Sequence, residues 1–471
     1  MAGSGSRYNL LAAGDWQGGE PIQKGPMDID TEDHPERSGW TTETRIRGEI
    51  LPPGSKSLGQ RALLAAGLSR GATRLLGLAG GADIEACLDL LRDGGLVVEG
   101  VPPGPVLIHG RPPGEWPACG PLQLGESGTL ARCATAFLAL STPAGSRFDL
   151  QARGSLVQRE SAPLVACLRA AGATIEPASP RGTWPLTLTS SRAPERLCLE
   201  EPISSQEFTA LALALASLEG THRLEVRGTL PSLPYVAMTC AVLAQFGAEL
   251  EAQGSSFEIC GPLRAPGAPV SIEPDASAAA VALAAACLAG SATRIGGFGE
   301  ASSQGDLAIV DHLVAFGCRA ELSGGVLSAT GRPLRGVDLD LTGEPDLAPV
   351  LLALAGAVAL EDQAAGATSR FCGLGTLNGK ECRRLDVLAA ALTRLGLAVR
   401  CGTDWLEVGP GSPTSDPLDL DPHGDHRMAF AFALLGLVRP GILVTHPGCV
   451  AKSWPGFWRD CTLPTSDAPA P

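Results

Sequence analysis

The sequence predicts an α/β protein with two domains, each built from three copies of one helix–strand unit. The chain has 471 residues, which is too long for one ordinary hydrophobic core, so two large domains are expected. Its apolar fraction of 44% is high enough to fill such cores. A self-similar pattern also recurs at a period of roughly 70–80 residues, and its six copies divide evenly between two domains.

Each copy of the pattern has the same internal order. A polar helix start opens a helix of small apolar residues, and a glycine turn leads into a short strand. A second, amphipathic helix follows, with another glycine and another strand. The first helices are expected to begin near Ser57, Ser127, Ser204, Asp275, Pro345 and Asp425. The second helices are expected over 84–92, 163–171, 235–246, 307–316 and 384–395, with a degenerate sixth at 457–461. Generic α/β proteins also repeat such elements, but five near-matching helix endings favour a true repeat.

The same pattern suggests where the domains begin and end. Residues 1–40 are polar and glycine-rich and contain the acidic run Asp28–Asp33, so we expect an irregular N-terminal extension. Residues 54–269 should form one domain, inserted between 41–53 and 270–471, which together form the other. The chain would then cross between the domains at Pro52–Gly54 and near the proline- and glycine-rich stretch Leu263–Pro269.

Composition excludes several classes of function. A formal net charge of −14 and an aromatic content of only 4% argue against a nucleic-acid or anionic-membrane partner. We expect no membrane span, because no strongly apolar stretch of about 20 residues is free of breakers. The 14 cysteines form no C-x-x-C pair, and several stand in apolar helical patterns, which predicts reduced, buried thiols. Without a recognisable signal peptide or acidic metal cluster, we expect a cytoplasmic protein with no metal and no cofactor.

The stretch that begins Pro52-Pro53-Gly54-Ser55-Lys56-Ser57 is the most informative in the chain. It leads directly into an apolar helical pattern, and the start of a helix favours anions because its N–H groups are unpaired. Lys56 and Arg61 would add two positive charges there, which suits a phosphate or a carboxylate. The alternative is a serine-capped helix with two solvated charges. A P-loop is excluded, because its glycine and lysine spacing is absent.

Further polar clusters stand at other helix starts, where small-residue packing does not require them. They are Gly125–Arg132, Arg159, Ser204-Ser205-Gln206, Asp346, Asn378–Arg384, Asp425-His426-Arg427 and Lys452. Singly, each could be a helix cap, a solvated face or a buried histidine. Together they supply many cations, a few carboxylates and one histidine, without a nucleophile paired to a base. This composition suits a substrate with several negative charges and chemistry by proton transfer.

These residues carry a resemblance to a known family. The chain resembles the 3-phosphoshikimate 1-carboxyvinyltransferases, or enolpyruvyl-shikimate-phosphate synthases, over about residues 45–460. The matching stretches, in the family's order, are Pro53-Gly54-Ser55-Lys56-Ser57 with Arg61, Ser127-Gly128-Thr129 with Arg132, Ser204-Ser205-Gln206, Pro234-Tyr235, Asp275-Ala276-Ser277, Gln304-Gly305-Asp306, Pro345-Asp346, Lys380-Glu381 with Arg384, Asp425-His426-Arg427-Met428, and Pro447-Gly448-Cys449 with Lys452.

The resemblance implies both a fold and a reaction. The fold would be a two-domain inside-out α/β fold of the enolpyruvyl transferase type, with six βαβαββ repeats, three per domain. The reaction would transfer the enolpyruvyl group of phosphoenolpyruvate to the 5-hydroxyl of 3-phosphoshikimate and release phosphate, in the shikimate pathway to chorismate and the aromatic amino acids. It would proceed through a tetrahedral intermediate without a metal or cofactor, in an enzyme that the family suggests is a monomer.

The resemblance also implies roles for individual residues. The phosphoenolpyruvate set would be Lys56, Gly128, Arg159, Gln206, Arg384, Arg427 and Lys452. The 3-phosphoshikimate set would be Lys56, Ser57, Arg61, Ser204, Ser205, Gln206, Ser232, Tyr235, Asp346 and Lys380. Asp346 and Glu381 would transfer protons, and Lys56 and His426 would complete the catalytic set.

Some positions depart from the family pattern and leave alternatives open. These are Leu58-Gly59-Gln60, Glu126, Glu160, Leu233 and Thr376. Leu233 and Thr376 keep open a related transferase that acts on another ring acceptor. The UDP-N-acetylglucosamine enolpyruvyl transferases would show a Lys-Asn pair at Lys56-Ser57 and a reactive loop cysteine, and neither is present. A non-catalytic homologue is disfavoured, because it would not need both Asp346 and Glu381.

Overall fold

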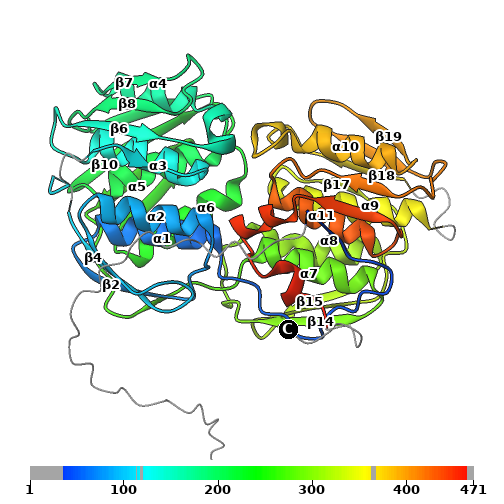
Figure 1. Ribbon diagram of the computed structural model, residues 1–471. Coiled ribbons are helices and arrows are strands. Elements are labelled where there is room, and N and C mark those ends of the chain that lie inside the picture. Colours follow the sequence, from blue (N-terminus) through cyan, green and yellow to red (C-terminus); the bar gives the residue numbers. More distant parts are fainter. Residues whose placement is uncertain (1–35, 113, 117–119, 362–367, 464–471) are drawn as a thin grey trace, which may run out of the picture. The chain divides into compact units, whose positions relative to one another are not determined.

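The computed structural model describes residues 36–112, 114–116, 120–361 and 368–463. Within them the chain forms six small sheets, and each belongs to one of the predicted repeats (Figure 1). Most of the extension predicted for residues 1–40 lies outside the described residues. The last part of the extension is described, and Arg37–Ser38 in it form strand β1, which pairs antiparallel with β22 (Ile442–Thr445).

The third unit shows the complete pattern of the repeat. Its elements in chain order are β9 (Arg196–Glu200), α5 (Ser205–Ala216), β10 (Gly220–Arg227), α6 (Leu233–Gln245), β11 (Glu249–Gln253) and β12 (Ser256–Gly261). The strands lie in the order β11-β12-β10-β9, with β9 and β10 parallel and the other neighbours antiparallel. The predicted βαβαββ unit is therefore confirmed.

The second and fifth units follow the same plan. The second consists of β5 (Leu122–Gln123), α3 (Gly128–Leu140), β6 (Arg147–Gln151), α4 (Ala162–Ala170), β7 (Thr174–Pro177) and β8 (Leu186–Thr189). The fifth consists of β17 (Asp338–Asp340), α9 (Ala348–Leu360), β18 (Ser369–Cys372), α10 (Arg384–Arg394), β19 (Ala398–Cys401) and β20 (Leu406–Gly409). In both, the first two strands are parallel and the last two form a hairpin.

The remaining units take a strand or a bridge from a distant part of the chain. The first has α1 (Lys56–Leu68), β2 (Gly71–Leu76), α2 (Ala82–Asp93), β3 (Val97–Glu99) and β4 (Val106–Gly110), and is completed by β13 (Val270–Ser271), parallel to β2. The fourth has α7 (Ala276–Leu288), β14 (Ala292–Gly296), α8 (Ile309–Phe316), β15 (Arg319–Ser323) and β16 (Val326–Thr330), with a bridge from Glu49 to Arg294. The sixth has β21 (Leu418–Leu420), α11 (His426–Gly436), β22 and the short α12 (Phe457–Asp460).

Two segments that are far apart in the sequence lie side by side next to helix α1. The Ser55 N–H donates to the Glu273 carbonyl at 2.8 Å, and the Asp275 N–H donates to the Pro53 carbonyl at 2.9 Å. Directly after the predicted linker Leu263–Pro269, β13 pairs with β2. The polar helix start at Lys56 follows the first of these two segments.

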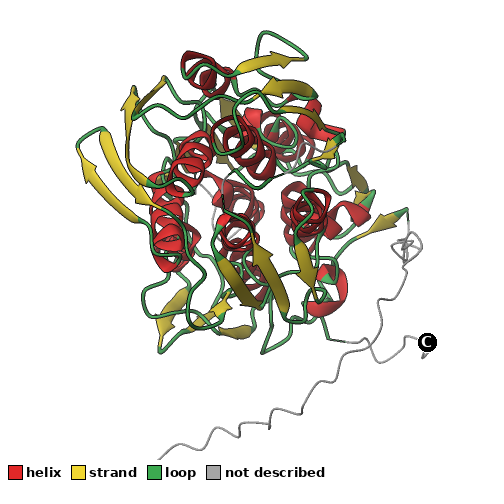
Figure 2. Ribbon diagram, turned by 90° about the vertical axis from the view of Figure 1, so that its left-hand side faces the viewer, coloured by secondary structure: helices red, strands yellow, loops and turns green. Residues whose placement is uncertain are grey.

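Small-residue helices occupy the interior, and the strands lie outside them (Figure 2). Helix α7, with the sequence Ala276–Leu288, is buried along almost its whole length because alanine side chains let its neighbours approach closely. The buried apolar residues form two clusters. One includes Leu58 to Ile272, and the other combines Trp40, Ile46 and Ile50 with residues from Ala276 to Cys461. Each cluster contains the first helices of three units, so their polar starts gather at the same place.

Two further expectations concerned membrane-spanning helices and the state of the cysteine thiols. None of the described helices is both long enough and apolar enough to span a membrane. The cysteines among the described residues are free thiols, and several are buried in the two clusters, including Cys87, Cys133 and Cys287. Burial raises the pKa of the Cys133 thiol to about 12, so it behaves as a small apolar side chain.

Candidate active site

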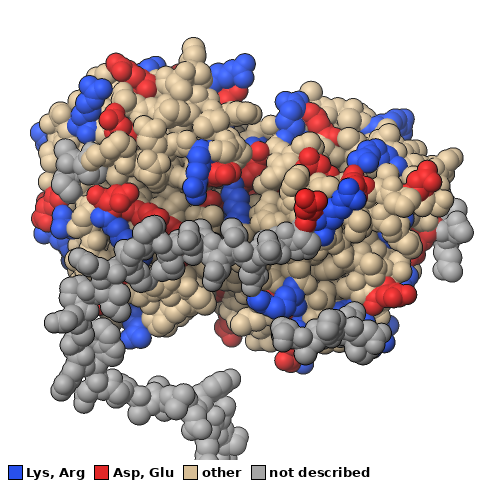
Figure 3. Space-filling model, in the orientation of Figure 1, with Lys and Arg blue, Asp and Glu red and all other residues tan. Residues whose placement is uncertain are grey.

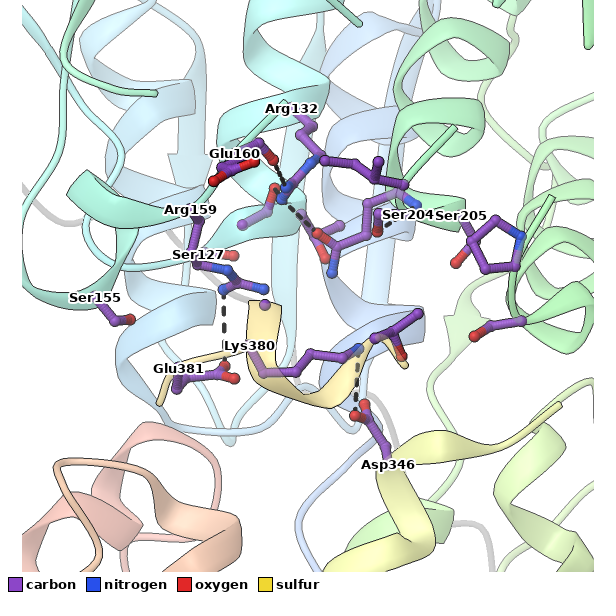
Figure 4. Close-up of a pocket in the computed structure, with 18 of the residues that line it drawn as sticks. Ser127, Arg132, Ser155, Arg159, Glu160, Ser204, Ser205, Asp346, Lys380 and Glu381 are labelled. Carbon is purple, nitrogen blue, oxygen red and sulfur yellow. Dashed lines mark hydrogen bonds and ion pairs between the residues drawn. The ribbon is translucent and has the colours of Figure 1, made fainter. Parts of the chain in front are cut away.

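The polar helix starts line a single cavity of about 1090 Å³ (Figure 4). Charged side chains of both signs gather where the two clusters of helices meet (Figure 3). The cavity brings together most of the residues that the sequence predicted, from both hydrophobic clusters: Lys56, Ser57, Arg61, Gly128, Arg159, Ser204, Ser205, Gln206, Ser232, Tyr235, Asp346, Lys380, Glu381, Arg384 and Arg427. His426 and Lys452 do not line it directly.

Helix α1 presents Lys56 and Arg61 to the cavity. Ser55 caps the helix by accepting from the Leu58 N–H, and the Lys56 N–H donates to Asp275 Oδ2 at 3.0 Å. The Lys56 Nζ lies 3.1 Å from Asp83 Oδ2, so its charge is paired but stays beside the cavity. Asp83 is therefore a site residue that sequence reasoning missed.

Arg61 is buried among hydroxyl groups. Its Nε donates to Thr239 Oγ1 at 2.9 Å and its Nη2 donates to Thr209 Oγ1 at 3.2 Å. Its Nη1 donates to the Ser57 carbonyl at 2.9 Å. Among the described residues, no carboxylate lies within ion-pair distance of Arg61, and burial lowers its pKa. A buried cation without a counterion is stabilised when an anionic ligand enters the cavity beside it.

Helix α3 begins beside Arg159, and Gly128 makes room for that side chain. A Cβ at position 128 would lie 2.7 Å from Arg159 Cζ and 2.8 Å from Arg132 Nη1. Glycine therefore lets two guanidinium groups approach this backbone closely, and a larger residue would displace them. Ser127 caps the helix, and the Gln60 Nε2 donates to Ser127 Oγ at 2.6 Å, which ties α3 to α1.

Two serine-rich helix starts supply hydroxyl groups. Ser204 caps α5 by accepting from the Gln206 N–H at 3.2 Å, and Ser205 follows it in the cavity wall (Figure 4). Ser232 precedes α6 with a φ of 53°, a left-handed conformation, and its side chain caps nothing. These hydroxyl groups are therefore available as donors to an anion.

On the other side of the cavity, Asp346 is surrounded by groups that favour its charged form. Its carboxylate lies 2.9 Å from Arg384 Nη1, 3.2 Å from Arg427 Nη2 and 3.4 Å from Lys380 Nζ. It also accepts from the Tyr235 hydroxyl at 3.2 Å. Burial alone would raise the pKa of Asp346, but these three cations hold it well below its usual range.

Glu381 occupies a second cage of cations. Its carboxylate lies 2.6 Å from Arg384 Nη2, 3.3 Å from Lys452 Nζ and 3.8 Å from Arg159 Nη1. Burial opposes ionisation, yet Lys452 and Arg384 hold the pKa of Glu381 well below its ordinary value. Arg384 also donates to Asp425 through Nε at 2.7 Å, so one guanidinium contacts three carboxylates.

His426 and Lys452 lie behind this second cage. His426 is buried at the start of α11, and its Nδ1 has no hydrogen-bond partner among the described residues. Burial and the nearby Lys56 charge place the pKa of His426 well below its usual value, so the ring is neutral at pH 7. Lys452 reaches the site through Glu381, whose charge raises the pKa of Lys452 despite burial. Lys452 therefore acts on Glu381 rather than on the open cavity, whereas the His426 Nδ1 lies 3.8 Å from Asp425 Oδ1.

Several residues that support the site were not among the predicted site residues. Asp425 and Arg132 stood in the quoted motifs without an assigned role, whereas Asp83, Thr209 and Thr239 carried no signal in the sequence. No group of acidic, histidine and cysteine side chains in the described part of the chain could hold a metal ion. Most of the charged groups that line the cavity are cations, which donate hydrogen bonds and have no lone pair for a metal ion.

The fold and the cavity define the class of protein, an enolpyruvyl transferase fold. The chain matches a solved structure of the EPSP synthase from Acinetobacter baumannii with a TM-score of 0.71 and 23% sequence identity, covering 89% of this chain and 96% of that chain. It also matches the enolpyruvyl transferase NikO from Streptomyces tendae with a TM-score of 0.66 and 19% identity, covering 90% of this chain and 96% of that chain. At these identities the likeness concerns the fold alone.

Sequence comparison identifies the family. A model of the EPSP synthase (3-phosphoshikimate 1-carboxyvinyltransferase) family matches residues 40–461, and the chain belongs to this family. Relatives named 3-phosphoshikimate 1-carboxyvinyltransferase include one from Bordetella bronchiseptica, 35% identical over 430 residues, covering 88% of this chain and 94% of the relative. Another, from Methanopyrus kandleri, is 36% identical over 429 residues, covering 88% of this chain and 95% of the relative.

Proposed function

We propose that this protein transfers the enolpyruvyl group of phosphoenolpyruvate to the 5-hydroxyl of 3-phosphoshikimate and releases phosphate. The family supports this reaction, which belongs to the shikimate pathway. The observation that carries it is the arrangement of the cavity, in which several cations surround two largely buried carboxylates, Asp346 and Glu381, and Arg159 reaches Glu381 from the other side. Two substrates that each bear a phosphate and a carboxylate need such a set of fixed charges.

The two substrates would occupy different parts of the cavity. The hydroxyls of Ser204, Ser205 and Ser232, with Lys380, would hold the phosphate of 3-phosphoshikimate, and Arg61 and Ser57 would face its ring and carboxylate. Phosphoenolpyruvate would lie against the Gly128 backbone and Gln206, between the cations of both sides. The cations that line the cavity here are Lys56, Arg159, Arg384 and Arg427. Lys452, the fifth expected cation, is paired with Glu381 behind them.

The carboxylates would move the protons of the reaction. Asp346 would take the proton of the 5-hydroxyl as its oxygen adds to C2 of phosphoenolpyruvate, while a proton is delivered to the methylene carbon. Glu381, with Lys56 and His426 beside it, would handle that second proton and remove it again when the C–O bond to phosphate breaks. Asp346 would pass the proton of the 5-hydroxyl to the departing phosphate, so that both carboxyl groups end as they began and the addition and the elimination balance.

The pKa values support a coupling between binding and chemistry. Without substrates, the cations hold both carboxylates ionised. When the substrate anions bind to these cations, they compete for the same charges, so the pKa of each carboxylate rises toward the range where it can also donate. Glu381 would thus become able to carry a proton only in the loaded site.

We further propose that residues 54–269 form a domain that closes on residues 41–53 and 270–471 around both substrates. The predicted site residues stand on helix starts from both hydrophobic clusters, so closure would complete the set. The protein would act in the cytoplasm as a monomer. Its only partners would be the two small-molecule substrates, since its net charge of −14 disfavours nucleic acid.

The test is phosphate release from phosphoenolpyruvate, with and without 3-phosphoshikimate, in buffer that contains a chelator. Release that requires both substrates and survives chelation supports the proposed reaction. No release, together with calorimetric binding of phosphoenolpyruvate, would indicate another ring acceptor. Thr376 is relevant to that outcome, because its hydroxyl lines the cavity and has no hydrogen-bond partner among the described residues. Absence of binding by either substrate would indicate a non-catalytic homologue.

A further inference from the structure

Glu207 is a buried carboxylate for which the proposed reaction has no use. It is the third residue of α5, directly after Gln206, and it is fully buried (0% exposed). It does not line the cavity. Acidic side chains are rarely buried to this extent without a specific set of partners, so its contacts indicate its role.

The carboxylate of Glu207 joins two separate segments of the cavity wall. One oxygen accepts from the Ser161 hydroxyl at 3.0 Å, and the other accepts from the Ile203 N–H at 3.0 Å. Ser161 is itself fully buried and stands two residues after Arg159. Ile203 directly precedes Ser204 and Ser205. A single side chain therefore links the segment that carries Arg159 to the segment that carries the serine hydroxyls.

Arg132 reinforces the same link from helix α3. Its Nη1 donates to Gln206 Oε1 at 2.8 Å, and its Nη2 donates to the Glu160 carbonyl at 2.5 Å (Figure 4). Burial raises the pKa of Glu207, and the charge of Arg132 opposes that shift. The peptide N–H of Ser161 adds a further bond, to the Arg181 carbonyl at 3.0 Å. The 159–161 segment is thus held from helices α3 and α5 and from the turn that contains Arg181.

We propose that Glu207 is a positioning residue that fixes Arg159 relative to Ser204 and Ser205, and so couples the two anion subsites of the cavity. This inference rests on the proposed function, which gives Arg159 to phosphoenolpyruvate and the serines to the phosphate of 3-phosphoshikimate. A guanidinium binds an oxyanion well only within a narrow range of distance and angle. Release of the Ser161 anchor would let Arg159 shift away from its place 3.8 Å from Glu381.

Three variants separate the two hydrogen bonds of Glu207, one from the Ser161 hydroxyl and one from the Ile203 N–H. Ser161→Ala removes only the hydrogen bond to the Arg159 segment. Glu207→Met removes both acceptors at similar volume. Glu207→Gln can keep both bonds, because its amide oxygen can accept from the Ile203 N–H while its NH₂ donates to the Ser161 oxygen. A matched control is Ser217→Ala, at the other end of α5, where a buried serine hydroxyl bonds Ala214 and Ser141 away from the cavity.

The measurement is KM for each substrate and kcat, with the calorimetric Kd of phosphoenolpyruvate as a second readout. Ser161→Ala should raise the phosphoenolpyruvate KM and Kd by about tenfold, with 3-phosphoshikimate KM and kcat within about threefold. Glu207→Met should raise both KM values, and Glu207→Gln should recover most of that loss. Ser217→Ala should lower the melting temperature without changing either KM.

Other results would overturn the inference in recognisable ways. If Ser161→Ala and Glu207→Met are folded and leave both KM values within twofold of wild type, Glu207 has only a structural role. If the wild-type protein releases no phosphate but binds phosphoenolpyruvate, the proposed function fails, and an unchanged Kd in Ser161→Ala would then refute the positioning role by itself. If the wild-type protein does not bind phosphoenolpyruvate, both proposals fall.

Discussion

The two sides of the cavity neutralise their cations in different ways. On the side formed by α1, α3 and α5, Arg61 and Arg132 are held by hydroxyls, an amide and backbone carbonyls, and no carboxylate lies within ion-pair distance of either among the described residues. On the side formed by α9, α10 and α11, Arg384 contacts three carboxylates, Asp346, Glu381 and Asp425. Lys56 on the first side is paired with Asp83, but Arg61 and Arg132 have no carboxylate partner there and are prepared to receive an anion. The second side holds the groups that can move protons.

This difference has a physical reason. A binding subsite gains most when the ligand supplies the missing counterion, so neutral partners are the better support for its cations. A catalytic carboxylate must be kept charged in a buried place until substrate arrives, so it needs cations around it. The following predictions test whether the two sides differ in this way, beginning with the largest expected effect.

Replacement of Glu381 should have the largest effect on turnover. Glu381→Gln keeps the shape of the side chain but removes its ability to exchange a proton, so kcat should fall by about 10²–10⁴-fold. The KM values should change far less, because the surrounding cations remain. Phosphate release at saturating substrates measures the effect, with Glu219→Gln as a control, since Glu219 pairs with exposed Arg70 outside the cavity. Near-normal turnover of Glu381→Gln would show that the assigned proton transfer is wrong.

The two kinds of cation should respond in opposite ways to substitution by methionine. Arg384→Met would leave three buried carboxylates without their shared partner, so the free energy of unfolding should fall by about 3–5 kcal/mol. Arg61→Met should cost much less, because Thr209 and Thr239 already hydrogen-bond each other at 2.8 Å. It should instead raise the 3-phosphoshikimate KM by about 100-fold, through loss of a charge-assisted contact.

Urea unfolding and steady-state kinetics of both variants test this contrast. A control for nonspecific loss of positive charge is Arg70→Met, because Arg70 forms an exposed pair with Glu219 outside the cavity. If Arg61→Met proved as destabilising as Arg384→Met, the distinction between a prepared binding cation and a structural cation would be refuted.

Gly128→Ala should produce a smaller and more selective effect. The added methyl group would lie 2.7 Å from Arg159 Cζ, and the far end of that flexible side chain can shift to make room. We expect the phosphoenolpyruvate KM to rise by about tenfold while the 3-phosphoshikimate KM stays within threefold. Gly120 offers a matched control, since a Cβ there meets nothing within 4 Å. Equal effects of both alanine variants would contradict the close packing of Arg159 on α3.

Helix starts were the part of the site that local sequence could predict. Asp425 and Asp275 each cap a helix that begins at the next residue, as expected from a short acidic side chain before a run of small apolar residues. Because the unit repeats, each of these helix starts stands at an equivalent position of its own unit. For this reason most predicted residues, from Lys56 to Arg427, meet in one cavity. Their roles toward the substrates remain predictions.

Long-range partners were beyond local sequence. The pairing of Val270–Ser271 with β2 joins segments about 200 residues apart and leaves no periodic signal. The same is true of the hydroxyls of Thr209 and Thr239 behind Arg61, which look like ordinary helix residues. Glu207 resembles a solvated charge at a helix start, and only the packing of α5 against the Ser161 segment buries it.

The last prediction concerns the pH dependence of stability, where the two sides should again differ. The folded-state pKa values of Asp346 and Glu381 lie well below the ordinary values of 3.8 and 4.5, so their ion pairs stabilise the fold above those ordinary values. That stabilisation is lost as the pH falls below about 4, at about 1.4 kcal/mol per pH unit for each group. Asp306 acts in the opposite sense, because burial, partly opposed by Arg427, raises its pKa to about 7.

At acidic pH, the free energy of unfolding of the double variant Asp346→Asn/Glu381→Gln should therefore fall less steeply with decreasing pH than that of wild type. The difference in slope should approach two protons, or about 2.7 kcal/mol per pH unit, below about pH 3 in urea unfolding, where both carboxyl groups are protonated in the unfolded chain. Arg61→Met should keep the wild-type slope, because the groups around Arg61 are hydroxyls and carbonyls that do not titrate there. Equal slopes for wild type and the double variant would mean that the two carboxylates are not held ionised, and with that the electrostatic contrast between the two sides would disappear.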